Sequence, residues 1–352
     1  MRNRWRYRTW LLVAALLLPS LPIRAQGTAL NETGSSLLYP LFQRWITDYM
    51  QLAPGVMLTA TATDSGAGIA AAISGDARIG ASDSYMSDEQ SEQHPSIANV
   101  PLAISAQTVN YNVPHLSDTG LNLDGPTLAA IYSGEATQWD AAPIATLNPG
   151  VKLPHQKIVP IRRKDDSGDT FIFTQFLSFS TQSWEDRFGY RTDVAWPEVA
   201  GAKTATGNQG MVDMLAATPY SIGYIGISFH DAVTRAGLGT ARLENQNGKF
   251  LLPTADTVTA AASELDLRTP ADERLSLVFA PGDNSYPLIN YEYALVATKQ
   301  PDPATAVALR GFLLWAVSNE GGNARKYLDA VGFIALPDFV RALSQKQINR
   351  IR

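Results

Sequence analysis

The feature that most constrains the fold of this chain is the alternation of strand-like and helix-like segments along its length. Residues 55–63 and 157–163 favour strands, and each of these segments leads into a stretch that favours a helix. Such alternation is typical of mostly parallel sheets whose strands are connected by helices. We therefore predict an α/β fold, and the length of 352 residues suits two domains that each bury a core.

Residues 1–25 have the composition of a secretory signal peptide. Arginines precede an apolar run that contains Pro19 and Pro22, and the small residue Ala25 follows it. The run is too short and too interrupted to span a membrane, and an uncleaved membrane anchor is the alternative interpretation. We predict that the signal peptide is cleaved and that the mature protein is periplasmic.

The cysteine count and the charge restrict the class of protein further. The chain has no cysteine, so it has neither a disulfide framework nor a thiol that could accept a lipid. Removing residues 1–25 leaves 23 of the 28 basic residues against 33 acidic ones, a net charge of −10 instead of −5. A protein with this charge repels nucleic acids and anionic membranes, so selectivity for an anion must come from local geometry.

Three turns, at 33–40, 63–70 and 165–171, share one design. Each places Gly beside Ser or Asp immediately before a helix-like segment. The first N–H groups of a helix lack intrahelical partners, glycine lets the backbone approach a ligand, and a serine hydroxyl adds a donor. These features suit an oxoanion site without a lysine. Helix capping is the simpler interpretation of any one turn taken alone.

The third turn also contains charged residues that suit a tetrahedral anion. The guanidinium of Arg163 can donate two parallel hydrogen bonds to one anion. Asp165 and Asp169 follow closely in the sequence, and a carboxylate beside an arginine can hold it in position. A surface cluster of ion pairs is the alternative interpretation.

Asp83 predicts that the bound anion carries a proton. An ionised carboxylate accepts hydrogen bonds and donates none, so it favours the P–OH group of phosphate over sulfate, which has no proton to offer near neutral pH. Leaving a buried acceptor unpaired costs about 1–3 kcal/mol, and more for a charged group. One such residue can therefore discriminate strongly between the two anions, although a capping Asp in a turn is the alternative.

With these motifs in this order, the chain resembles the periplasmic phosphate-binding proteins of the high-affinity bacterial phosphate transporter, the PstS family. The resemblance covers nearly all of residues 27–345 and rests on segments such as GSSLLYPLFQRW, SGAGIAAAISGDARIGASD, IVPIRRKDDSGDTFIFT, GNQGMV and YPLINYEYALV. It implies a two-lobed periplasmic-binding-protein fold, each lobe a mostly parallel sheet flanked by helices, with the ligand in the cleft between the lobes. It also implies high-affinity binding of inorganic phosphate and its delivery to the membrane subunits of an ABC importer.

The resemblance further implies which residues bind phosphate. Asp83 would accept the phosphate proton, Leu37 would donate its backbone N–H, and Asp165 would hold the arginine in place. Some family members have Thr where this chain has Asp169, and this carboxylate either weakens anion binding or pairs with the arginine. Some also have Thr in place of Ser36 and Phe in place of Leu37. The full implied set is Ser36, Leu37, Ser65, Asp83, Arg163, Asp165, Ser167, Gly168 and Asp169.

The same resemblance places residues 27–105 and 287–352 in the first lobe and residues 106–286 in the second. The two strands that cross between the lobes would form the hinge for closure. We expect a monomer whose partners are inorganic phosphate and the transporter, and not nucleic acid.

An enzyme is the main alternative class, and a phosphatase would need metal ions or an activated nucleophile. The four histidines lack metal-ligand spacing, and Ser167 lies outside a G-x-S-x-G motif. We therefore predict no catalytic residue, no metal and no cofactor. A binder of another tetrahedral oxoanion, or a secreted relative with a sensing or adhesion role, remains the second alternative.

Overall fold

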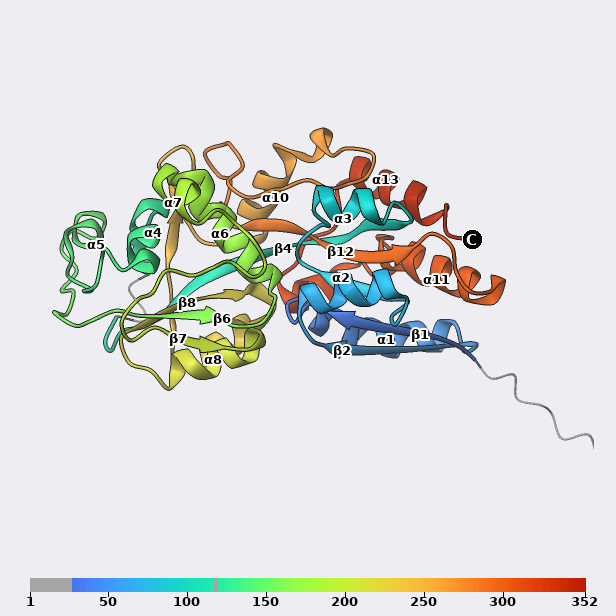
Figure 1. Ribbon diagram of the computed structural model, residues 1–352, viewed down its shortest axis with the longest axis horizontal. Helices are drawn as coiled ribbons and strands as arrows, with labels where there is room; N and C mark the ends of the chain where they lie inside the picture. The colour runs from blue at the N-terminus through green and yellow to red at the C-terminus, as the bar shows by residue number, and fades with distance from the viewer. Residues whose placement is uncertain (1–26, 117–119) are drawn as a thin grey trace, which may run out of the picture.

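The computed structural model describes residues 27–116 and 120–352. The predicted signal peptide, residues 1–25, lies outside the described residues. Figure 1 shows an elongated molecule in which the blue and red elements, from the two ends of the chain, lie toward one end and the green and yellow elements toward the other. Among the helices of the described residues, none combines the length and the apolar character needed to cross a bilayer.

Nine strands of the described residues form one sheet, in the order β2-β1-β3-β12-β4-β8-β6-β7 with β9 paired to β4. The pairs toward its two ends are parallel: β1 pairs with β2 and β3, and β6 pairs with β7 and β8. The predicted α/β class is confirmed. The strands of this sheet are β1 (Thr28–Gly34), β2 (Val56–Ala62), β3 (Ile79–Ser82), β4 (Ile97–Asn112), β6 (Val159–Arg163), β7 (Lys203–Ala205), β8 (Ser221–Gly226), β9 (Gly239–Thr240) and β12 (Ile289–Ala297).

The centre of the sheet is antiparallel because β4 and β12 run along the molecule in opposite directions. β4 pairs with β12 as far as Ala106 and with β8 from Gln107 onward, so this single strand belongs to both ends of the sheet. In Figure 1 both strands lie between the two groups of elements. A separate small sheet has the order β11-β10-β5 and consists of β5 (Asn122–Leu123), β10 (Arg242–Glu244) and β11 (Phe250–Leu251).

The longer helices bury apolar faces, and the sequence periodicity predicts that of α1. In α1, for example, Phe42, Trp45 and Tyr49 are buried, and the Tyr49 ring lies 5.0 Å from that of Phe312 in α11. The helices are α1 (Tyr39–Leu52), α2 (Ser65–Ser74), α3 (Asp88–Gln93), α4 (Gly125–Ser133), α5 (Ala142–Leu147), α6 (Gly168–Ser180), α7 (Gln182–Arg187), α8 (Gly207–Ala216), α9 (His230–Arg235), α10 (Ala255–Ser263), α11 (Pro303–Ala316), α12 (Arg325–Leu328) and α13 (Asp338–Ile348).

The segment around Glu273 packs on the end of the molecule that contains β1, α1 and α13. The Glu273 carboxylate accepts hydrogen bonds from Ser344 and Gln347 of α13. This segment lies within the range 106–286, so its contacts cross the division into lobes that the sequence suggests.

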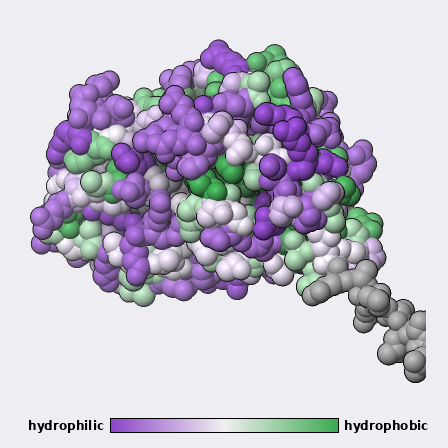
Figure 2. All heavy atoms as spheres, turned by 45° about the vertical axis from the view of Figure 1, so that its right-hand side comes forward, coloured by the Kyte–Doolittle hydropathy of each residue, from purple (hydrophilic) through white to green (hydrophobic). Residues whose placement is uncertain are grey.

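Figure 2 shows one face of the molecule, on which hydrophilic residues predominate and the hydrophobic ones form small groups between them.

Candidate functional site

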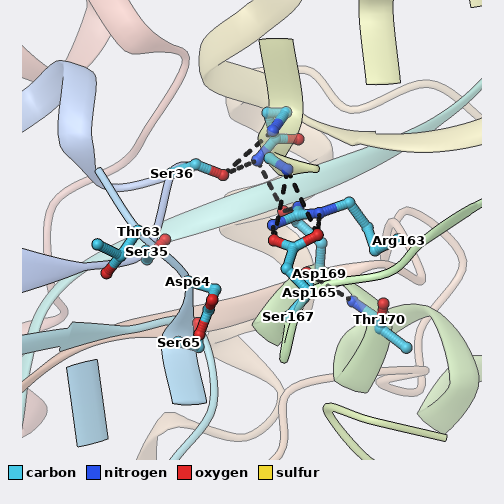
Figure 3. Close-up of polar contacts among 12 residues, drawn as sticks. Ser35, Ser36, Thr63, Asp64, Ser65, Arg163, Asp165, Ser167, Asp169 and Thr170 are labelled. Carbon is cyan, nitrogen blue, oxygen red and sulfur yellow. Dashed lines mark hydrogen bonds and ion pairs between the residues drawn. The ribbon is translucent and has the colours of Figure 1, made fainter. Parts of the chain in front are cut away.

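Loops from the two ends of the sheet meet at one place, where each of the three predicted turns leads into a helix. From one end come the turn before α1, the start of α2 and the loop after β3; from the other come the turn between β6 and α6 and the start of α8. Figure 3 shows Ser35 and Ser65 on one side and Arg163 and Asp169 on the other. The sequence therefore predicts correctly that these turns begin helices, and the structure brings them together.

Asp83 lies immediately after β3 and is 3% exposed. The hydroxyl of Ser35 donates to its Oδ1, and the hydroxyl of Ser65 donates to its Oδ2 at 3.3 Å. The Ser65 hydroxyl also accepts the backbone N–H of Asp83 at 3.1 Å, which fixes the start of α2 against the end of β3. Asp83 is thus a buried acceptor that two serines hold in position.

Gly168, the first residue of α6, touches the pair formed by Asp83 and Ser65. A methyl group at Gly168 would lie 2.7 Å from Oδ2 of Asp83 and would also collide with the Ser65 hydroxyl. Close by, the N–H of Gly66 donates to the carbonyl oxygen of Asp166 at 2.9 Å. The backbone of Gly168 on one side of the site therefore lies against the side chains of Asp83 and Ser65 on the other side. Only glycine allows this approach.

Arg163 ends β6 and is 4% exposed. Its Nε donates to Asp165 at 2.8 Å and its Nη2 donates to the other oxygen of the same carboxylate, while Nη1 donates to Asp169 at 2.7 Å. These bonds use three of the five N–H groups of a guanidinium and leave two for other acceptors. The structure thus pairs Asp169 with the arginine, one of the two possibilities that the sequence leaves open.

Asn208 joins the two sides of the site, and sequence reasoning missed it. Its Nδ2 donates to the Ser36 hydroxyl at 3.0 Å and to Asp169 at 2.7 Å, and its Oδ1 accepts the N–H of Gly226 at 2.7 Å. The side chain is completely buried. The motif GNQGMV at the start of α8 contains this residue, but an asparagine there is also an ordinary helix-start residue.

Ser35 is a second site residue that the sequence did not single out. Its hydroxyl accepts the N–H groups of Leu37 and Leu38 at 3.0 and 3.1 Å, so the Leu37 N–H is engaged within its own turn. The carbonyl oxygen of Leu37 accepts a hydrogen bond from Ser228 at 2.8 Å. Ser167 is the N-cap of α6, accepts the Thr170 N–H at 3.4 Å, and is completely buried.

Burial dominates the electrostatics of the site. It raises the pKa of Asp83 above the ordinary range, and the nearby charge of Asp169 raises it further, while the hydrogen bond from Ser35 and the charge of Arg163 oppose the shift. For Arg163, burial lowers the pKa, but the hydrogen bonds that it donates to Asp165 and the charges of Asp169 and Asp165 more than offset this effect. The arginine therefore stays charged in an otherwise acidic site.

A pocket of about 1180 Å³ adjoins the site at Gly66 and Asp166. Aromatic residues including Tyr85 and Phe171 line it, together with charged side chains such as Arg274. Within the described ranges 27–116 and 120–352, no group of three His, Cys, Asp or Glu residues is arranged to hold a metal ion. The site itself offers hydrogen-bond donors and the guanidinium of Arg163.

Comparison with known proteins places this chain in a family. The model of the PBP superfamily domain matches residues 24–320. The phosphate-binding protein PstS of Methanocaldococcus jannaschii is 32% identical over 341 residues, which cover 92% of this chain and 86% of that protein.

Solved structures agree on the fold. The high-affinity periplasmic phosphate-binding protein PfluDING, bound with phosphate, superposes with a TM-score of 0.73 at 22% identity, covering 91% of this chain and 93% of that chain. An ABC-type phosphate transport receptor from Vibrio cholerae has a TM-score of 0.54 at 17% identity and covers 87% of this chain and 99% of that chain. The chain therefore belongs to the PBP superfamily and, within it, to the PstS family of phosphate-binding proteins.

Proposed function

We propose that this protein binds inorganic phosphate in the periplasm and delivers it to a phosphate ABC importer. The observation that carries the proposal is the buried Asp83, which two serine hydroxyls orient toward the first turn of α6. A carboxylate in an anion site is unfavourable unless the anion supplies a proton, and phosphate does so near neutral pH. The names of the relatives, which are phosphate-binding proteins, support the same ligand.

In this proposal one charged group and several neutral donors hold the phosphate. The two remaining N–H groups of Arg163 donate to it, and so do the free N–H groups at the start of α6, beginning with Gly168. The hydroxyls of Ser36 and Ser167 complete the set, and the Ser65 hydroxyl joins it by turning its single proton from Asp83 to the anion. Asp165 and Asp169 position the arginine and do not face the anion directly.

The resemblance assigns a phosphate-binding role to the backbone N–H of Leu37, and Ser35 is the residue that accepts this N–H. The Leu37 N–H donates to the Ser35 hydroxyl, and that hydroxyl in turn donates to Asp83. A phosphate that contacts the Leu37 N–H directly would require this turn to rearrange. We therefore propose Ser35 as the residue that links the first turn to the acceptor.

We also propose that the two ends of the sheet act as lobes, 27–105 with 287–352 and 106–286, which close on the ligand about β4 and β12. The bonds from Asn208 to Ser36 and from Gly66 to Asp166 would then form only in the closed state. Because the segment around Glu273 packs on α13, we propose that it moves with the first lobe. A monomeric, soluble carrier released from its signal peptide is consistent with this cycle.

Calorimetric titration of the purified protein, stripped of phosphate, tests the proposal. We expect one phosphate to bind per chain and a generic phosphate ester to remain unhydrolysed with or without added divalent metal. Absence of phosphate binding would refute the proposal, and metal-dependent turnover of the ester would favour a phosphatase instead. Export of the protein and growth of a deletion strain on limiting phosphate test the location and the delivery role.

A further inference from the structure

Glu292 is a buried acid that the proposed function does not use. It lies in β12, in the segment NYEYALV, and its side chain is completely buried. The pairing of β12 with β4 shifts register between Glu292 and Tyr293, where Leu102 of β4 has no partner residue in β12. An isolated acid in an apolar strand needs a specific partner to be tolerated.

The partners of Glu292 lie at the base of the anion site. Its Oε1 accepts hydrogen bonds from Ser105 at 2.5 Å and from Asn290 at 3.3 Å. The same Asn290 amide donates to the backbone carbonyl of Asp83 at 2.7 Å, so Glu292 and Asp83 are held on one scaffold. Within the described residues, Oε2 of Glu292 receives no hydrogen bond. One carboxyl oxygen is therefore available to act as a donor if it carries a proton.

The charges around this pair of carboxyls decide where a proton lies. Asp83 faces Glu292 from the end of β3 and Asp169 contributes a further negative charge from α6, while Arg163 of β6 is the cation that acts on Asp83. Burial and then the charge of Asp83 raise the pKa of Glu292 well above its usual range, and burial and then the charge of Asp169 raise that of Asp83. Two adjacent buried carboxyls cannot both ionise cheaply, so one proton stays with the pair.

We propose that Glu292 is a positioning residue of the anion site, which stays protonated in the folded protein and donates a hydrogen bond to Asp83. This bond keeps Asp83 ionised and directs its free lone pairs toward the proton of the anion. The inference rests on the proposed function, because only a ligand with a P–OH group makes use of an ionised Asp83. Glu292 itself does not touch the ligand.

Two substitutions separate a hydrogen-bond donor from a simple packing role. Glu292→Gln keeps an N–H donor toward Asp83 and an oxygen for Ser105, so phosphate affinity should stay within about threefold of the wild type. Glu292→Leu removes the donor, and phosphate affinity near neutral pH should fall about tenfold or more because Asp83 then becomes protonated more easily. The deficit of the leucine variant should shrink as pH rises, since Asp83 then regains its charge.

Glu273→Gln is the matched control, because Glu273 is also a completely buried acid but its partners are Ser344 and Gln347 of α13. This variant should leave phosphate affinity unchanged. A similar loss in Glu292→Gln and Glu292→Leu, or wild-type affinity in Glu292→Leu, would overturn the proposal.

Carbon-13 NMR of the side-chain carboxyls tests the proton directly and does not depend on phosphate binding. The signal that Glu292→Gln removes should have the chemical shift of a neutral carboxyl at neutral pH. A shift typical of an ionised carboxylate would contradict the proposal even if phosphate binds. A wild-type protein that shows a neutral Glu292 but binds no phosphate would instead refute the proposed function.

Discussion

Gly168 lies so close to Asp83 that a single added carbon would be 2.7 Å from the carboxylate oxygen Oδ2. The two residues are 85 positions apart in the sequence and come from opposite ends of the sheet. Their contact places the proposed acceptor for the anion's proton beside the helix start that we propose as a donor. If the two ends of the sheet act as lobes, their closure and the completion of the site are the same event.

The first prediction concerns that contact. Gly168→Ala should weaken phosphate binding about tenfold or more, because the extra methyl group overpacks the closed interface by about 1–3 kcal/mol. Gly210→Ala is the matched control, since a methyl group there would lie 3.7 Å from Ala205, an ordinary packing distance. Phosphate titrations of both variants make the comparison. Equal affinities in the two variants would show that the lobes do not close at Gly168.

A second prediction tests the arginine geometry. Arg163→Lys keeps the positive charge but cannot donate to Asp165, Asp169 and an anion in the same planar arrangement. The phosphate dissociation constant should rise about tenfold to a hundredfold, as expected when a charged hydrogen-bond donor is lost. The neighbouring Arg162→Lys is the control, because Arg162 donates to the carbonyl oxygens of Pro197 and Tyr132 outside the site. An unchanged constant for Arg163→Lys would remove the guanidinium from the site.

A third prediction concerns Asn208. Asn208→Ala removes the amide that joins Ser36 to Asp169 and leaves Asp169 with an unpaired lone pair in a buried position. Phosphate affinity should drop about tenfold, mainly through faster release. Asn112→Ala is a suitable control because its amide donates to carbonyl oxygens at the other end of α8. Stopped-flow release rates that match in the two variants would argue against a closing contact at Asn208.

Some of the site could be predicted from sequence because its parts are local. Arg163, Asp165, Ser167 and Gly168 lie within six residues, so their spacing alone indicates a turn that can hold an anion. Ser36 and Asn208 are 172 residues apart, and no pattern along the chain connects them. Contacts of this kind can be predicted only when the strand order of the sheet is known, and the pattern of residues along the chain does not reveal that order.

The fold shows the same division between local and long-range information. The amphipathic face of α1 and the strand character of β6 follow from residue spacing, and both are found. The strand β1 was not predicted, because Asn31 and Glu32 interrupt its apolar pattern. Pairing with β2 and β3 on its two sides imposes the strand conformation there, which is a tertiary effect on a weak local preference.

The buried acid in β1 supports a fourth prediction, on stability. Burial raises the pKa of Glu32 to about 8 and that of Glu273 also to about 8. The folded state then holds protons that the unfolded state has released above about pH 4.5, so the free energy of unfolding should fall as pH rises from about 4.5 to about 8.

Glu32→Gln should make this decline shallower, by up to about 1.4 kcal/mol per pH unit. Urea unfolding at several pH values within the window measures the slope. The exposed Glu320→Gln is the control and should leave the slope as it is in the wild type. If Glu32→Gln has the wild-type slope, Glu32 is not protonated in the folded protein.

The most direct test of the central claim is a calorimetric titration of the wild type and of Asp83→Asn with both phosphate and sulfate. In the wild type, phosphate should bind and sulfate should give no heat, because the Asp83 carboxylate accepts a proton that sulfate lacks. An amide can donate to an unprotonated oxygen, so in Asp83→Asn the preference for phosphate should shrink by about tenfold to a hundredfold. If the variant discriminates between the two anions as strongly as the wild type does, Asp83 does not read the proton of the ligand.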